Sequence, residues 1–181
     1  MTEKFKVLIG YDGSDCANEA IEDLTLAGLP DETEAIVFSA ADVWETPESF
    51  NYLLRDAEKP TREHLDAAQK HFAESLEEVQ KLAEEGAARL RALFPAWSVS
   101  AETRSGKPAW EIVEKSDEWQ PDLLVVGSHG RTAVGRAFLG SVSQKVLHEA
   151  QCPVRISRRR ISETGAPLRI RRFGPISGDP S

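Results

Sequence analysis

Several glycines and hydroxyl side chains follow the apolar residues 123–126 of this 181-residue chain. Among them are Gly127, Ser128, Gly130, Thr132, Gly140, Ser141 and Ser143. Glycine adopts positive φ easily and lets a ligand approach the main chain, and free N–H groups at the start of a helix bind anions. The pattern therefore predicts a phosphate-binding loop, with an ordinary flexible loop as the simpler alternative.

A helix expected at residues 141–150 begins inside this stretch, and Gly140 and Ser141 would open it. Its free N–H groups and its dipole favour an anion. The hydroxyls of Ser141 and Ser143 would add donors, and Arg131 would add a fixed positive charge. We therefore expect the glycines and hydroxyls to form one anion-binding site at a strand end and a helix start.

A second polar turn, "YDGSD" at residues 11–15, follows the first apolar run of the chain. Asp12 could accept hydrogen bonds from a ribose hydroxyl or an adenine amino group. Asp-Gly pairs are also frequent turn formers and helix caps. The sequence leaves both interpretations of Asp12 open.

Other known site patterns are absent from the chain. It has no GxxxxGK[ST] motif, no GxGxxG after the first apolar run and no GxSxG nucleophile motif. Side chains that are adjacent at a strand end point to opposite faces, so we expect no Ser128–His129 pair. The remaining histidines and the two cysteines have no metal-ligand spacing: His64, His71, His148, Cys16 and Cys152. We predict no catalytic residue and no protein-held metal.

Short apolar runs alternate with stretches of three- and four-residue apolar spacing along the chain. The predicted strands are 5–11, 34–40, 97–104, 122–127 and 153–157, and the predicted helices are 18–29, 65–93, 106–119 and 141–150. Continuous apolar strands suit a parallel sheet that is covered on both faces. Ligands bind such sheets beyond the carboxyl ends of the strands, where the strand order reverses. If the first and fourth strands are neighbours, both polar turns open onto one crevice.

The charge is unevenly distributed along the chain. Hydrophobic residues make up 40% of it and charged residues 29%, as in soluble globular proteins. Residues 151–181 contain seven of the 22 Lys and Arg residues, which leaves residues 1–150 with 28 acidic and 15 basic side chains. An acidic body disfavours nucleic acid as a partner. No apolar run reaches the ~20 residues of a membrane helix and the start is unlike a signal peptide, so we expect a cytoplasmic protein.

Two stretches resemble the universal stress protein family. "KVLIGYDGSDCANEAI" resembles the opening strand and helix of the family, and "DLLVVGSHGRTAVGRAFLGSVSQKVLHEAQCPVRIS" resembles its closing half. ATP-binding members of the family carry Gly-x2-Gly-x9-Gly-Ser/Thr, which Gly127, Gly130, Gly140 and Ser141 match. The resemblance covers residues 4–158.

This resemblance implies an α/β fold with a five-stranded parallel sheet of order 3-2-1-4-5 and helices on both faces, like that of the adenine nucleotide alpha hydrolases. It implies an ATP-binding regulatory protein with slow hydrolysis at most, and Mg²⁺ or Mn²⁺ bound through the phosphates. Asp12 would contact the adenosine, and the segment 40–43 would lie against the base. The full set of implied nucleotide-binding residues is Tyr11, Asp12, Gly13, Ala40, Val43, Val126, Gly127, Ser128, Gly130, Arg131, Gly140, Ser141, Val142 and Ser143.

The resemblance also implies a homodimer through the last strand, where Val154 and Ile156 would need cover at an exposed edge. Residues 44–62 are long and aromatic for their position, and the Gly-, Pro-, Ser- and Arg-rich residues 159–181 are expected to form a flexible tail after a domain at 1–158. Two other functions stay open. One is an ATP-using enzyme of the ATP-pyrophosphatase or adenylating type, and the other is a partner-binding module without nucleotide.

Overall fold

The computed structural model describes residues 4–41, 62–130 and 139–158. Five parallel strands form one sheet of order β3-β2-β1-β4-β5. The strands are β1 (Phe5–Gly10), β2 (Thr33–Ala41), β3 (Ser98–Ser105), β4 (Leu123–Gly127) and β5 (Val154–Ser157). The fold class and the strand order expected from the sequence are confirmed.

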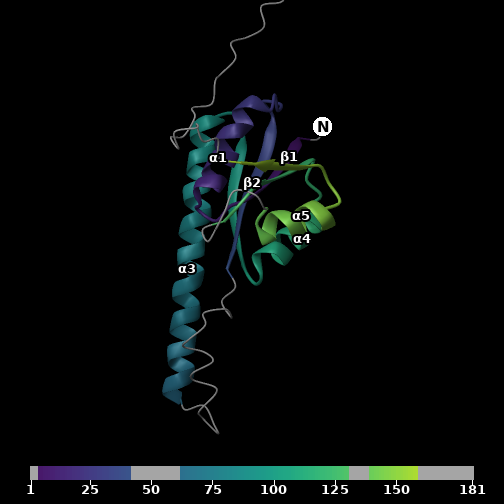
Figure 1. Ribbon diagram of the computed structural model, residues 1–181. Helices are drawn as coiled ribbons and strands as arrows, with labels where there is room; N and C mark the ends of the chain where they lie inside the picture. The colour runs from purple at the N-terminus through teal and green to yellow at the C-terminus, as the bar shows by residue number, and fades with distance from the viewer. Residues whose placement is uncertain (1–3, 42–61, 131–138, 159–181) are drawn as a thin grey trace, which may run out of the picture.

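Helices cover both faces of the sheet, as Figure 1 shows. The helical elements are α1 (Asp15–Asp23), the 3₁₀ turn η1 (Leu24–Leu26), α3 (Arg62–Leu93), α4 (Pro108–Trp119) and α5 (Ser141–Glu149). Helices α1 and α3 pack on one face, and α4 and α5 pack on the other. Among the helices that the structure describes, we find none that combines the length and the apolar character needed to cross a membrane.

The central strand β1 supplies both hydrophobic cores. Val7 and Ile9 pack toward α1 and α3, while Leu8 packs toward α4 and α5, and all three side chains are fully buried. Because successive side chains of a strand point to opposite faces, a strand between two helical layers must be apolar at every position. This is the physical reason for the continuous run at the start of the sequence.

The predicted elements are close to the observed ones. Helix α1 begins three residues earlier than expected, and η1 follows it from Leu24. After η1 the chain turns at Gly28, which has φ +64°. Pro108 occupies the first turn of α4, as expected from its fixed φ. The long helix ends at Leu93, two residues before Pro95. Of the residues 44–62, which are long and aromatic for their position, all but Arg62 lie outside the described residues.

Helix α3 extends well past the sheet at its amino-terminal end (Figure 1). Its carboxyl-terminal half packs on the sheet through Val79, Ala83, Ala87 and Leu90. The described side chains nearer its start are exposed, including Phe72 at 38%. Among the described side chains of α3, those from Val79 onward therefore supply its contribution to the core, and Phe72 does not.

The chain leaves β1 and β4 toward opposite faces. These strands are neighbours, with Gly10 paired to Val126 at their carboxyl ends. The chain continues from β1 to α1 on one face and from β4 to α5 on the other. The predicted crevice between the two polar turns therefore lies at the carboxyl edge, at the point where the strand order reverses.

Candidate functional site

A cavity of about 460 Å³ opens at this carboxyl edge. Ten of the predicted nucleotide-binding residues line it: Tyr11, Asp12, Ala40, Val126, Gly127, Gly130, Gly140, Ser141, Val142 and Ser143. Gly13 and Ser128 lie beside the cavity without lining it, and Val43 and Arg131 lie outside the described residues. The tertiary structure thus brings the two predicted turns and the start of α5 around one space.

Seven further residues line the cavity that the sequence reasoning did not select: Gly10, Ala17, Phe38, Pro108, Ile112, His129 and Leu139. Of these, Gly10 carried a signal in the sequence, since a glycine in a buried strand often marks a close approach. A Cβ on Gly10 would lie 2.9 Å from Ile112 Cδ1 and 3.1 Å from Val126 Cγ1. Pro108 and Ile112 come from α4, which no local pattern connects to the two turns.

The start of α5 offers main-chain donors to the cavity. Its N-cap Gly140 has extended geometry (φ −64°, ψ 160°) and provides no side-chain cap. The Gly140 N–H donates to the Ser128 carbonyl at 2.8 Å, so it is not free. The next three N–H groups, of Ser141, Val142 and Ser143, have no carbonyl four residues back within the helix to receive them. The first turn contains no acidic residue, which leaves the dipole available to an anion.

The Ser143 hydroxyl serves the fold rather than the cavity. It is directed at the carbonyl oxygens of Gly127 (2.9 Å) and Ser128 (3.0 Å), and Ser143 is 2% exposed. The hydroxyl has a single proton, so in this arrangement the side chain does not supply the donor that we expected for a phosphate. It ties the loop after β4 to α5 and leaves the Ser143 main-chain N–H as the available group.

The turn after β1 is built around Asp12 and Ser14. Asp12 Oδ1 accepts a hydrogen bond from Ser14 N at 3.0 Å, and Ser14 Oγ accepts one from Ala17 N at 3.2 Å. Gly13 has φ +76°, a conformation that other residues adopt at a cost. Asp12 is therefore a turn former, and it also lines the cavity. Its contact with a nucleoside stays a prediction.

The glycines after β4 provide space and not unusual backbone conformations. Positive φ occurs at Gly13, Gly28 and Gly106 among the described glycines, so Gly127 and Gly130 do not use the positive φ that glycine permits. A Cβ on Gly127 would lie 2.8 Å from the Cys16 carbonyl carbon and 2.9 Å from Ala17 N. Gly127 therefore lets β4 pack against the start of α1.

Gly130 lies against the turn after β1. A Cβ there would lie 2.8 Å from Asp12 Oδ2, and a Cβ on Gly140 would make only contacts of 3.4 Å or more. Gly127 and Gly130 thus have spatial reasons to lack a side chain, and Gly140 has none. Gly127 and Gly130 bring the turns after β1 and β4 together.

Ser128 and His129 form a hydrogen-bonded pair, which corrects our expectation. Ser128 Oγ lies 3.0 Å from His129 Nδ1 and 3.8 Å from Cys16 Sγ. The alternation of side chains no longer holds here, because β4 ends at Gly127. Ser128 is fully buried and its main chain is bonded to Ser157 and Gly140, so it is not an exposed nucleophile.

Tyr11 forms part of the cavity wall and stays neutral. Burial raises the pKa of its phenol, and the hydroxyl donates to Asn18 Oδ1 at 2.7 Å. Its main chain is fixed on both sides, since Tyr11 N donates to the Phe38 carbonyl and Ser39 Oγ donates to the Tyr11 carbonyl. Tyr11 therefore contributes a fixed and uncharged part of the cavity wall.

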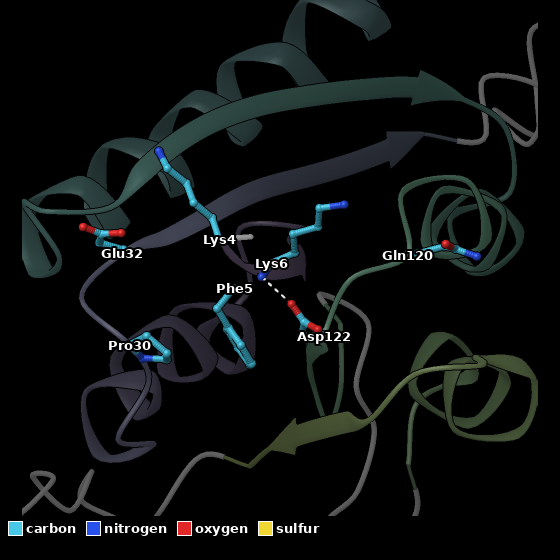
Figure 2. A pocket seen from close by; sticks show the side chains of 7 residues that line it. All are labelled: Lys4, Phe5, Lys6, Pro30, Glu32, Gln120 and Asp122. Atoms are coloured by element: carbon cyan, nitrogen blue, oxygen red, sulfur yellow. Dashed lines mark hydrogen bonds between the residues drawn. The ribbon is translucent and has the colours of Figure 1, made fainter. Parts of the chain in front are cut away.

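A second cavity of about 480 Å³ lies at the opposite, amino-terminal edge of the sheet (Figure 2). It contains Lys4 and Lys6, but also the carboxylates of Glu32 and Asp122. The ammonium groups of the two lysines point away from each other in Figure 2, and Lys6 lies over the ring of Trp119 at 5.6 Å. These groups do not converge on one ligand, so the cavity at the carboxyl edge is the better candidate.

No group of three or more His, Cys, Asp or Glu side chains that could hold a metal ion occurs within residues 4–41, 62–130 and 139–158. The donors around the cavity are instead main-chain amides, which suit an anion.

Comparison with known families identifies the chain. The model of the universal stress protein family matches residues 5–158, which include both turns and all five strands. The chain belongs to the universal stress protein family. Universal stress protein MJ0531 of Methanocaldococcus jannaschii is 31% identical over 156 residues, which are 85% of this chain and 82% of the relative. A universal stress protein of Thermus aquaticus is 33% identical over 152 residues, with 84% and 97% covered.

Solved structures share the fold of this universal stress protein. Hypothetical protein MJ0577 superimposes with a TM-score of 0.68 at 22% identity, over 87% of this chain and 97% of the other. A universal stress protein in complex with cAMP gives 0.55 at 22% identity, over 87% and 98%. A family protein from Arabidopsis thaliana with AMP bound gives 0.53 at 19% identity, over 86% and 92%.

Proposed function

We propose that this universal stress protein binds ATP in the cavity at the carboxyl edge and acts as a regulatory protein in a stress response. One observation carries the proposal. Three main-chain amides at the start of α5 lack helical partners where the helix meets a cavity of about 460 Å³ between β1 and β4. This volume lies within the range of about 300–1,000 Å³ typical of small-molecule sites.

The lining of the cavity suits the two parts of a nucleotide. The phosphates would bind at the amides of α5. Phe38, Ala40 and Ile112 are apolar lining residues and would lie against the base. The cAMP and AMP complexes of two structural neighbours support an adenine nucleotide as the ligand class. Any Mg²⁺ or Mn²⁺ would bind mainly through the phosphates.

The protein is proposed to hold ATP with slow hydrolysis at most. Fast hydrolysis needs a positioned water and groups that stabilise the transferring phosphoryl group. The described lining residues offer Asp12 as the single carboxylate, and its Oδ1 is bonded to Ser14 N. We expect the protein to act in the cytoplasm.

Nucleotide analysis tests this proposal. Purified protein is denatured and the released nucleotide is identified, and Mg-ATP is titrated into nucleotide-free protein by calorimetry. Retained or tightly bound ATP is the expected result. Steady production of AMP with pyrophosphate would favour an adenylating enzyme, and a cavity that takes up no nucleotide would favour a partner-binding module.

Gly130→Val is the matching variant. Its side chain would enter the space occupied by Asp12 Oδ2, so we expect ATP binding to be lost while unfolding stays cooperative. Trp110→Ala is the control, because Trp110 is 59% exposed and does not line the cavity. Full ATP affinity in Gly130→Val would contradict the proposed site.

We also propose that β5 joins two copies of the chain. Leu124 N donates to the Pro153 carbonyl and Ser128 N donates to the Ser157 carbonyl, so alternate residues of β5 are bonded to β4. In a parallel pair the main-chain groups of Val154 and Ile156 then face outward, free to pair with another strand. This edge supports a two-fold dimer.

Sedimentation equilibrium tests the dimer. Ile156→Pro removes an outward-facing N–H without removing a bond to β4, so it should yield a monomer. Ile156→Ala shortens the same side chain but keeps the N–H, and it should remain dimeric. A dimer that survives the proline change would contradict pairing through β5, and a monomeric wild type would contradict the dimer itself.

A further inference from the structure

Leu147 of α5 is a large apolar side chain that is 52% exposed. The preceding residue, Val146, is fully buried in the core between α5 and the sheet. Lys145 lies on the flank of α5 that faces α4, since its Nζ is 3.1 Å from the centroid of the Trp110 ring. Residues two positions apart are about 200° apart around a helix, so Leu147 lies on the opposite flank, away from α4.

The flank of α5 that carries Leu147 is the one nearest the free edge of the sheet. Helix α4 packs over β2 and α5 packs over β5, which is the last strand of the sheet. The side chains of Val154 and Ile156 lie on the same face as α5 and are only partly buried. Three incompletely covered apolar side chains therefore lie along the edge where the main-chain groups of β5 face outward.

The opposite face of β5 is polar and satisfied within the chain. Arg155 Nε donates to Asp23 Oδ2 at 2.9 Å, and Ser157 Oγ donates to the same oxygen at 3.0 Å. These groups already have their partners. The face of α5 is therefore the side of this edge that burial against another chain would stabilise.

The charged side chains of α5 lie away from Leu147. Lys145 and Glu149 pair with each other at 2.5 Å, one turn apart on the flank toward α4. Gln144, one turn before Leu147, is exposed and uncharged. Two such flanks can meet without placing a carboxylate or an ammonium group of α5 between them, so no like-charge repulsion opposes the contact.

Two-fold symmetry would place these flanks side by side. When two edge strands pair antiparallel, the axis that relates them runs perpendicular to the sheet, so helices on one face of the first copy lie on the same face of the second. Helix α5 borders the shared edge in both copies. Leu147 then lies near the axis and close to its counterpart.

We propose that α5 is a dimerisation helix whose Leu147 flank packs against the same flank of a second copy, over the paired β5 strands. This inference rests on the proposed dimer through β5 and names the side-chain surface that holds it together. Strand β5 is four residues long. Hydrogen bonds between two such short strands give little net stability in water, so apolar burial beside them supplies much of the affinity.

Sedimentation equilibrium of the full chain tests the inference with two opposite charges. Leu147→Asp and Leu147→Lys each place two like charges near the axis, and each should raise the dimer dissociation constant about 100-fold. In an equimolar mixture of the two variants opposite charges meet, so the dimer should form about tenfold more tightly than in either variant alone. Trp110→Asp is the matched control, since it removes an apolar side chain that is 59% exposed on α4, and it should dimerise as wild type.

The mixture separates a lost contact from misfolding, because two misfolded variants would not restore each other. Unchanged dimer affinity in Leu147→Asp, equal weakening in Trp110→Asp, or a mixture that dimerises no better than its components overturns the role of α5. Each of these results leaves the pairing through β5 standing. A monomeric wild type overturns the proposed dimer together with this inference.

Discussion

Helices α1 and α5 begin at the same edge of the sheet, with nearly identical backbone geometry, and yet only one leaves its amides available. The N-cap of α1, Ser14, has φ −67° and ψ 161°, and the N-cap of α5, Gly140, has φ −64° and ψ 160°. Both helices are nine residues long. Ser14 Oγ satisfies the Ala17 N–H, whereas Gly140 has no side chain with which to cap α5.

The first turns differ in charge and packing as well. Asp15 lies in the first turn of α1, where its charge complements the dipole, and α5 has no acid there. The end of β4 packs against Cys16 and Ala17 at the start of α1, at the position where Gly127 has no Cβ. The chain itself therefore caps the N–H groups at the start of α1, whereas the N–H groups at the start of α5 remain available to an anion. Four changes test this difference.

Gly127→Ala should have the largest effect. Its Cβ would lie 2.8 Å from one main-chain atom of α1 and 2.9 Å from another, and main-chain atoms cannot move aside cheaply. We expect the free energy of unfolding to fall by about 3 kcal/mol, measured by urea denaturation. Gly140→Ala is the control and should change it by less than about 0.5 kcal/mol, since its Cβ makes only ordinary contacts. Equal losses in both variants would contradict the separate roles of the two glycines.

Gly140→Asp would cap the start of α5 with a side chain, as Ser14 caps the start of α1. The carboxylate can accept from the free amides and repels phosphates, so ATP affinity should fall about 100-fold while stability is retained or rises slightly. Gly140→Asn caps without a charge and should lose about tenfold. Calorimetry with ATP, beside thermal unfolding, measures both effects. Unaltered affinity in Gly140→Asp would show that the start of α5 is not the phosphate site.

Ser14→Ala would remove the side-chain cap of α1 without creating a second anion site. Loss of the cap should lower the free energy of unfolding by about 1 kcal/mol. ATP affinity should change by less than about threefold, because Asp15 remains in the first turn. A large loss of affinity at full stability would mean that Ser14 itself contacts the ligand.

Ser141→Asp should have the smallest effect on stability. It places an acid at the first position of α5, as Asp15 stands in α1, and the helix dipole should then stabilise the protein by about 0.5 kcal/mol. ATP binding should weaken at the same time. Ser141→Asn, which adds no charge, should leave stability nearly unchanged. Tighter ATP binding in Ser141→Asp would contradict an anion at this end of α5.

Much of the architecture was predictable because the determining signals are local. The apolar run that became β1, the spacing within α3 and the stop at Pro95 each depend on neighbouring residues. The motif of Gly127, Gly130, Gly140 and Ser141 predicted the family, and the family predicted the strand order. The cavity wall from α4 was missed, because Pro108 and Ile112 reach it only through long-range packing.

The residues after β4 show where local reasoning was insufficient. The sequence suggested that Gly127 and Gly130 let a ligand approach the main chain and that the Ser143 hydroxyl points at the ligand, and it argued against a Ser128–His129 pair. In the structure the glycines serve close packing, the Ser143 hydroxyl binds two carbonyls, and Ser128 and His129 are bonded. Each outcome depends on which atoms of α1 and α5 lie against the residues after β4. These contacts are made by distant parts of the chain and cannot be inferred from a few neighbouring residues.

The amino-acid sequence by itself determined the alternating strands and helices, the family and the place of a glycine- and serine-rich loop, since periodicity and residue type act over short distances. Only the tertiary structure decided which polar groups are satisfied internally and which remain for a ligand. Hydrogen-bond partners are assigned by the packing of segments more than a hundred residues apart, such as Ser14 and His129. That assignment distinguishes the closed start of α1 from the open start of α5.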